Sequence, residues 1–282
     1  MRSLPQPTAR VRAVTQLCTS TLQNADLSAR ITTILDTLET GEADYESRGR
    51  RAELFQVAVT AAVGTVTRDE MQTLYTTKLR RQREPARAIY NAIMASPKYG
   101  KCPLCAERLV STLDHYLPQT AHALFVITPL NLIPACSECN KAKAAKQAAS
   151  AHEQTLHPYF DDVDGEVWLS ARVVEEVAPV LVFAVDPPDT WSHITKDRVR
   201  VHFQMFGLSR LYAMKASQDL AQIRDYLIRL ADSAGPDGVR EFLREQAVSR
   251  GAVEKNSWQA AMYRALSRSR WFWEGGLRGI DS

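Results

Sequence analysis

The chain has 282 residues, of which 45% are hydrophobic and 24% charged, and its formal net charge is +3. This composition is typical of a soluble globular protein that is long enough for one large domain or two ordinary ones. No stretch approaches the roughly 18 consecutive apolar residues that a membrane helix needs, and the N-terminus lacks the apolar region of a secretory signal. We therefore expect a cytoplasmic protein, and the mild basic charge is compatible with a polyanionic partner without demonstrating one.

The first hundred residues have the pattern of a helical region. Residues 1–15 carry two prolines and scattered arginines without an apolar period, which predicts a loose tail. From Leu27 onward the apolar residues recur at helical spacing, which predicts a helix. A second helix is expected over 51–63, and a third over about 68–94 that Pro85 divides into two. We therefore expect an N-terminal helical region over 1–96.

The composition and the pattern of apolar residues change twice after this region. Residues 97–160 contain four paired cysteines, several prolines and short apolar runs. This stretch is expected to form the functional centre of the protein, distinct from the helical region before it. Residues 161–282 are expected to begin with two strands within 163–185, separated by Pro179, and then to return to helix with a break at Gly235. The predicted fold class is α+β and mostly helical, with the centre embedded between helical segments.

Four of the five cysteines form two C-x-x-C pairs, which are separated by 30 residues. In a reducing compartment such pairs indicate a metal site rather than disulfides, and four thiolates are the ligands of a closed, structural zinc site. A redox-active pair is the alternative, but no thioredoxin-like βαβ pattern surrounds either one. The fifth cysteine, Cys18, lies in a helical pattern and is expected to be a core residue. The expected zinc ligands are Cys102, Cys105, Cys136 and Cys139.

Polar residues between the two pairs suggest a second metal site. Asp114 and His115 come near the end of an expected strand before Pro118, and Asn140 begins a helix expected over 138–149. A carboxylate and an amide oxygen can hold a hard cation, and a neighbouring histidine can act as a base at neutral pH. Each residue alone has a simpler interpretation, because single histidines are usually structural and asparagine is common at helix starts. The occurrence of all three residues between or directly beside the two cysteine pairs favours a second metal site.

The segment 102–143 carries the pattern DH-x-x-P, N-L and C-x-x-C-N-x-x-K, and it resembles the zinc-knuckle form of the bacterial HNH (ββα-metal) endonuclease motif. The resemblance implies that His115 is the general base, that Asn131 orients it, and that Asp114 and Asn140 bind the catalytic cation. Many family members have histidine at the position of Asn140. The all-oxygen pair in this chain therefore favours Mg²⁺ or Mn²⁺.

The activity implied by the resemblance is metal-dependent hydrolysis of phosphodiester bonds, with nicking of DNA, in bacterial antiphage defence. Two alternatives remain open: a zinc-knuckle protein that binds nucleic acid without catalysis, and a nuclease subunit that is active only with a partner ATPase. A basic run over 78–87 is either a DNA contact or a solvated helix face. His122 is expected on a surface loop, and His157 is expected to pack against the ββα centre.

Overall fold

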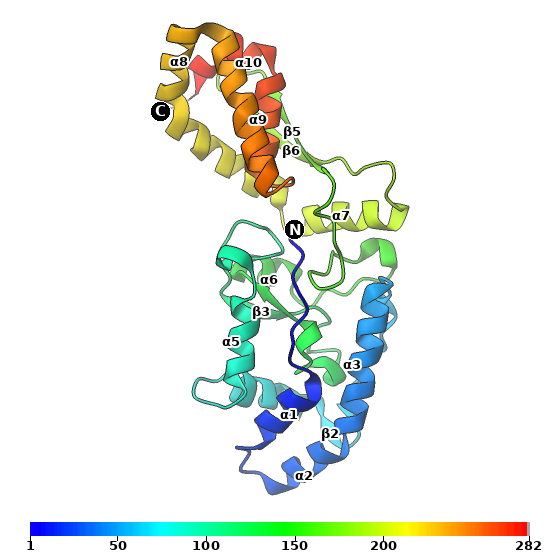
Figure 1. The fold of residues 1–282 in the computed structure, drawn as a ribbon. Coiled ribbons are helices and arrows are strands. Elements are labelled where there is room, and N and C mark those ends of the chain that lie inside the picture. Colours follow the sequence, from blue (N-terminus) through cyan, green and yellow to red (C-terminus); the bar gives the residue numbers. More distant parts are fainter. Residues whose placement is uncertain (281–282) are drawn as a thin grey trace. The chain divides into compact units, whose positions relative to one another are not determined.

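The computed structural model describes residues 1–280, and these form two compact units, Met1–Asp162 and the described residues from Val163 onward (Figure 1). The first unit contains both the expected helical region and the expected nuclease centre. Within residues 1–280 the fold is mostly helical and has three small antiparallel sheets, which confirms the α+β class. None of the described helices combines the length and the apolarity that a membrane-spanning segment requires.

The first unit is built on helices whose apolar faces share one core. Val11, Val14 and Cys18 lie three or four residues apart on one face of the first helix and are fully buried, so the prediction for Cys18 is confirmed. The helical segments are α1 (Val11–Thr19), α2 (Ala25–Thr33), α3 (Leu35–Arg50), α4 (Arg68–Leu74), the π-helical turn η2 (Tyr75–Leu79) and α5 (Arg87–Ala95), with short 3-10 turns η1 (Leu54–Gln56), η3 (Lys98–Gly100), η4 (Ala123–Phe125), η5 (Pro129–Asn131) and η6 (Ala151–Glu153). The interruption between η2 and α5 contains Pro85, as predicted.

Two hairpins complete the first unit. The strands β1 (Ala62–Val63) and β2 (Val66–Thr67) flank Gly64, whose φ of +55° suits a tight turn. The strands β3 (Thr112–His115) and β4 (Leu132–Ala135) pair antiparallel, and α6 (Ser137–Lys143) follows directly. The order of these last three elements is therefore strand, strand, helix.

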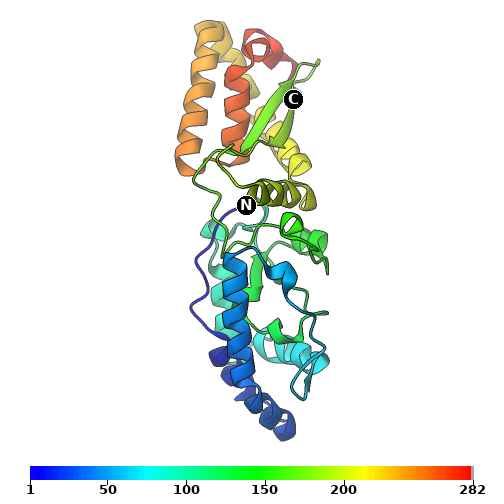
Figure 2. The same cartoon turned by 90° about the vertical axis from the view of Figure 1, so that its right-hand side faces the viewer.

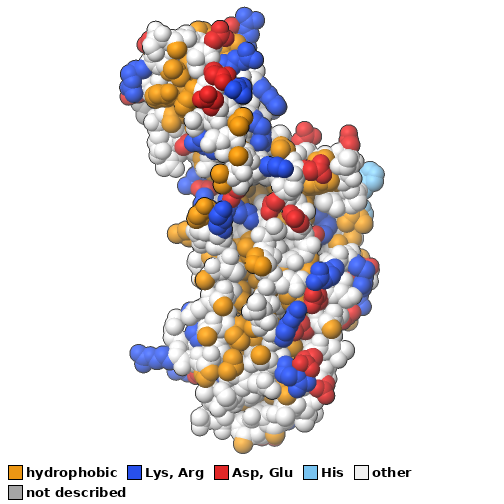
Figure 3. Space-filling model, viewed as in Figure 1, with side chains coloured by type: hydrophobic (Ala, Val, Ile, Leu, Met, Phe, Trp, Pro, Cys, Tyr) orange, Lys and Arg blue, Asp and Glu red, His pale blue; other side chains and the backbone are white. Residues whose placement is uncertain are grey.

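Ion pairs cover the exposed face of α3. Arg48 pairs with Asp44 and Arg50 with Glu46, each one helical turn apart. Figure 3 shows basic and acidic side chains interleaved along this helix. The charges on this surface therefore largely offset one another, and α3 presents no uniformly basic face.

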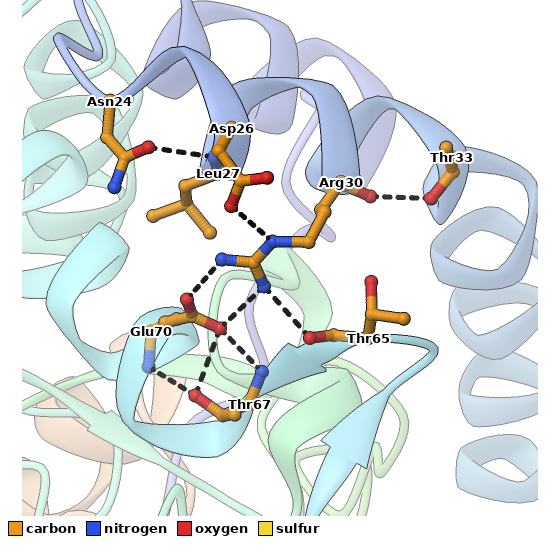
Figure 4. Close-up of polar contacts among 8 residues, drawn as sticks. All are labelled: Asn24, Asp26, Leu27, Arg30, Thr33, Thr65, Thr67 and Glu70. Carbon is orange, nitrogen blue, oxygen red and sulfur yellow. Dashed lines mark hydrogen bonds and ion pairs between the residues drawn. The ribbon is translucent and has the colours of Figure 1, made fainter.

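A polar network joins α2 to the start of α4 (Figure 4). The Arg30 guanidinium donates to the Asp26 carboxylate at 2.8 Å, to both Glu70 oxygens at 2.5 and 3.0 Å, and to the Thr65 carbonyl at 2.9 Å. Glu70 also accepts from the Thr67 amide at 2.8 Å while the Thr67 hydroxyl accepts from the Glu70 amide, which forms a capping box. The hydrogen bond from Arg30 and that from the Thr67 amide lower the pKa of Glu70 to about 2.

We expect Glu70→Gln to destabilise the protein at pH 7 by about 1 kcal/mol, because the ion pair is partly exposed. The folded protein lowers the pKa of Glu70 from 4.5 to about 2, so its carboxylate stabilises the fold above pH 4.5. This contribution is lost as the pH falls towards 2. Urea unfolding of the wild type and the variant should therefore differ at pH 7 and converge in acid, and a difference that is constant with pH would contradict the assignment.

The second unit packs a two-stranded hairpin beside helices (Figures 1 and 2). Pro179 lies between the two strands, directly before the second one begins at Val180. The helix over Leu208–Val253 is interrupted at Gly235, where φ is +68°, so both predicted breaks are confirmed. The elements are β5 (Leu169–Val174), β6 (Val180–Val185), α7 (His193–Met205), α8 (Leu208–Val253), α9 (Trp258–Arg268), α10 (Arg270–Glu274) and the 3-10 turn η7 (Gly276–Gly279).

Three predictions about backbone structure are wrong. The N-terminal residues are not a loose tail, because the Arg2 amide donates to the Pro103 carbonyl at 2.8 Å and α1 begins at Val11. The expected helix over 51–63 is replaced by η1 and β1, with Thr60 bridged to the 121–123 segment. The expected helix over 138–149 ends at Lys143, since Ala144 adopts a φ of +49°.

Candidate functional site

The four paired cysteines form one cluster. Their Sγ atoms all lie within 4.8 Å of one another, and all four residues are buried. A tetrahedral zinc site with Zn–S bonds of ~2.3 Å has S–S edges of about 3.8 Å, so this donor set and this spacing fit zinc. The residues concerned are Cys102, Cys105, Cys136 and Cys139, as predicted from their spacing.

Each C-x-x-C pair is held by a backbone amide directed at sulfur. The Cys105 thiol accepts from the Arg108 amide, and the Cys136 thiol accepts from the Cys139 amide at the start of α6, each at 3.4 Å. Hydrogen bonds within the cluster, the largest from Cys102, lower the pKa of Cys105. Hydrogen bonds within the cluster also raise the pKa of Cys102 and of Cys139, so the four thiols share protons and behave as one group of donors.

The cluster joins the first turn of α6 to the segment that precedes β3. Cys136 lies immediately after β4 and accepts the N-terminal amide of α6, so the second cysteine pair fixes where the helix begins. Asp114 and His115 are the last two residues of β3 and pair with Ile133 and Leu132 of β4. Strand pairing and the cysteine cluster thus bring the end of β3 against α6.

The hydrogen bond of His115 indicates which of its nitrogens can accept a proton. Its Nε2 lies 2.8 Å from the Val126 carbonyl oxygen, and a carbonyl can only accept, so Nε2 carries the proton of the neutral ring. Burial lowers the pKa of His115 to about 4, which keeps the ring neutral at pH 7. Its Nδ1, which has no hydrogen-bond partner among residues 1–280, is therefore left with an available lone pair.

Tyr75 supports the His115 ring from the helical region. The two ring centroids lie 4.7 Å apart with an interplanar angle of 67°, which is an edge-to-face contact. Both side chains are buried, with 4% of Tyr75 and 6% of His115 exposed. The imidazole is thus held by the carbonyl on one side and by an aromatic ring on another.

A buried lysine accompanies Asp114. The Lys143 ammonium lies 3.3 Å from the Asp114 carboxylate and donates to the His115 carbonyl at 2.6 Å, and only 4% of this lysine is exposed. Burial raises the pKa of Asp114 to about 6, and the charge of Lys143 acts in the opposite direction. Lys143 therefore joins the last turn of α6 to the two polar residues at the end of β3.

Asn131 ties together the loop between the two strands. Its side-chain oxygen accepts from the Leu117 amide at 2.7 Å and from the Tyr45 hydroxyl at 3.0 Å. Its nitrogen donates to the Leu117 and Phe125 carbonyls at 3.1 and 3.0 Å. Phe125 directly precedes the carbonyl that holds His115, so Asn131 fixes the loop that orients this ring.

A cavity of about 320 Å³ opens beside these residues. Asp114, His115 and Asn140 all line it, so three of the predicted site residues share one space, while Asn131 lies behind it in the loop. The residues that line it therefore include a carboxylic acid, an amide and an imidazole. Oxygen donors of this kind suit Mg²⁺ or Mn²⁺, and the neutral imidazole suits proton abstraction.

Two further histidines of this region, His122 and His157, are buried. His122 is not on the surface, because Nδ1 lies 3.2 Å from the Ala58 carbonyl and Nε2 lies 3.0 Å from the Gln147 side chain. The surface-loop prediction for His122 is therefore wrong. His157 packs against Tyr116 at 4.4 Å between ring centroids, and its Nε2 contacts the Tyr45 hydroxyl at 3.2 Å. The packing prediction for His157 is confirmed, and Tyr45 links it to Asn131.

The sequence analysis assigned no role in the site to three residues, of which Lys143 is the last residue of the quoted pattern. Lys143 carried a usable signal, because it lies three residues after Asn140 and thus near it on one helix face. Tyr45 and Tyr75 carried none, since both come from helices distant in sequence and reach the site only through tertiary packing.

Comparison with known proteins gives one full-length likeness. Protein ea31 of Escherichia phage lambda is 24% identical over a 296-residue alignment that covers 98% of this chain and 100% of the phage protein. The likeness thus extends over both compact units rather than over the cysteine segment alone. No protein-family model matches the chain, and no solved structure matches it significantly.

Proposed function

We propose that this chain is a metal-dependent HNH-type endonuclease that hydrolyses phosphodiester bonds of DNA in the cavity beside β3 and α6. The observation that carries the proposal is the state of His115. Its Nε2 is held by the Val126 carbonyl, and its Nδ1 is the available base in a cavity that also contains Asp114 and Asn140. A protein that only binds nucleic acid needs neither a neutral buried base nor an adjacent carboxylate.

The residues have separate duties in this proposal. Asp114 and Asn140 would hold Mg²⁺ or Mn²⁺, which as a Lewis acid offsets the charge that develops at the phosphate. His115 accepts a proton from water at Nδ1 while the water oxygen bonds to phosphorus and the bond to the leaving oxygen breaks. Asn131 and Tyr75 keep the imidazole oriented, and the zinc-binding cluster keeps α6 against β3.

Supercoiled plasmid incubated with the protein and Mg²⁺ or Mn²⁺ tests the proposal. The wild type should convert supercoiled plasmid to open circle, and chelation of the divalent cation should stop the conversion. His115→Ala should lose the activity, while His193→Ala, an exposed histidine of the second unit, should retain it. The exposed control separates loss of the base from contamination by a host nuclease.

The alternatives predict other outcomes of the same assay. A non-catalytic zinc-knuckle protein would retard the plasmid on a gel without nicking it, in both the wild type and His115→Ala. A subunit that works with an ATPase would nick only when that partner is added. Equal nicking by the wild type and His115→Ala would overturn the assignment of His115.

A further inference from the structure

The cavity beside His115 has a second wall that comes from the helical region. Tyr75 begins η2 and Arg80 follows it, and both line the cavity together with Asp114, His115 and Asn140. We propose that the Arg80 guanidinium binds a phosphate of the substrate strand in this cavity. This inference rests on the proposed function and adds a substrate contact outside the ββα segment.

The position of Arg80 is fixed by a π-helical turn. The Arg80 amide donates to the Tyr75 carbonyl at 2.8 Å, which is a bond across five residues instead of the four of an α-helix. Such turns are frequent at functional sites. Tyr75 packs edge-to-face on His115. The turn therefore holds the backbone of Arg80 at a defined position relative to the proposed base.

Two hydrogen bonds attach this wall to the loop on the other side of the cavity. Arg68 in α4 donates to the Thr120 carbonyl at 2.8 Å, and Gln72 donates to the Gln119 carbonyl at 3.0 Å. Gln119 and Thr120 themselves line the cavity. The helical segment that carries Arg80 is therefore bound to the rim of the site.

Most of the basic run over 78–87 is occupied by contacts within the protein or lies outside the cavity. Lys78 pairs with Glu84 at 3.3 Å, and Arg87 lies over the Tyr90 ring at 4.4 Å. Arg81 is exposed and does not line the cavity, and Figure 3 shows basic side chains projecting beside the loop before α5. Arg80 is the member of this run that faces the site.

The charges in the cavity favour an anion at Arg80. Its guanidinium makes no hydrogen bond or ion pair within the described part of the chain, and its side chain is exposed. The nearby carboxylate of Asp114 is already paired with Lys143. A guanidinium presents donors in a planar fork that matches two phosphate oxygens, so a phosphodiester is a suitable ligand.

The test measures binding without cleavage. In the His115→Ala background, affinity for a fluorescent DNA duplex is measured over a range of salt concentrations, with and without Arg80→Ala. Loss of one phosphate contact should weaken binding by about tenfold and reduce the slope of log affinity against log salt by about 1. Arg81→Ala, the matched exposed arginine, should have the smaller effect on both.

Cleavage kinetics supply the second readout. In the otherwise wild-type protein, Arg80→Ala should lower kcat/KM for plasmid nicking by about tenfold, the effect of losing one charged contact, and Arg81→Ala should leave it unchanged. Equal effects of the two substitutions on binding and on kcat/KM would overturn the proposal. If the wild type nicks no faster than His115→Ala, the proposed function fails, and the salt slope alone then decides whether Arg80 contacts phosphate.

Discussion

Cys136→Ser should abolish zinc binding and unfold the first unit at temperatures where the wild type is folded. Structural zinc sites contribute on the order of 10 kcal/mol or more to folding, because the site does not exist in the unfolded chain. Serine at this position can still cap α6, since its hydroxyl is a good acceptor for the amide that Cys136 now accepts. The loss should therefore report the missing metal ligand and not a missing helix cap.

Elemental analysis and hydrogen exchange on the full chain measure the two parts of this prediction. The wild type should contain one zinc per chain, and its amides in 1–162 should be protected. Cys18→Ser is the matched control, because Cys18 is buried but lies outside the cluster, and this variant should retain zinc. A folded wild type without zinc, or a Cys136→Ser variant with a full equivalent of zinc, would contradict the assignment.

Lys143→Met should destabilise the protein by about 3 kcal/mol or more. Methionine has a similar length without the charge, so the substitution leaves the Asp114 carboxylate buried and without its cation. The His115 carbonyl also loses the donor at 2.6 Å. Lys141→Met is the matched control, since Lys141 is an exposed lysine of the same helix and its replacement should cost little.

A double-mutant cycle isolates the buried pair. Asp114→Asn combined with Lys143→Met removes both charges, so the double variant should be more stable than the sum of the single losses predicts, by about 1 kcal/mol or more. Urea unfolding of the four proteins at pH 7 gives this coupling free energy. Strictly additive losses would show that the 3.3 Å ion pair contributes nothing to stability.

The cysteine cluster could be predicted because its chemistry is local. Two C-x-x-C pairs supply four soft donors whatever else the chain does, and the structure brings their sulfur atoms together. The breaks at Pro179 and Gly235 were predictable for a similar reason, since they depend on the conformational limits of single residues.

The failure over 51–63 arises because a distant segment satisfies the backbone. The apolar spacing over 51–63 favours helix, yet the Thr60 amide donates to the Ala121 carbonyl and the Thr60 carbonyl accepts from the Ala123 amide. These long-range bonds override the local pattern and bury His122 beside them. No property of the segment itself indicates a partner some sixty residues away.

In the candidate site, too, some features could be predicted from local sequence and others depend on long-range packing. The sequence predicted that Asp114, His115 and Asn140 come together, and the structure brings all three to one cavity. The roles proposed for Tyr75 and Arg80 depend on how the helical region packs against that cavity. The basic run over 78–87 was a candidate DNA contact in the sequence, but only the packing distinguishes Arg80, which lines the cavity, from its neighbours.

The most direct test of the account is the rate at which supercoiled plasmid is nicked by the wild type and by His115→Ala, both folded and zinc-loaded, at saturating Mg²⁺ or Mn²⁺. Removal of a general base should lower the rate by about a hundredfold or more. Equal rates for the two proteins would contradict the role of His115 and, with it, the proposed endonuclease site.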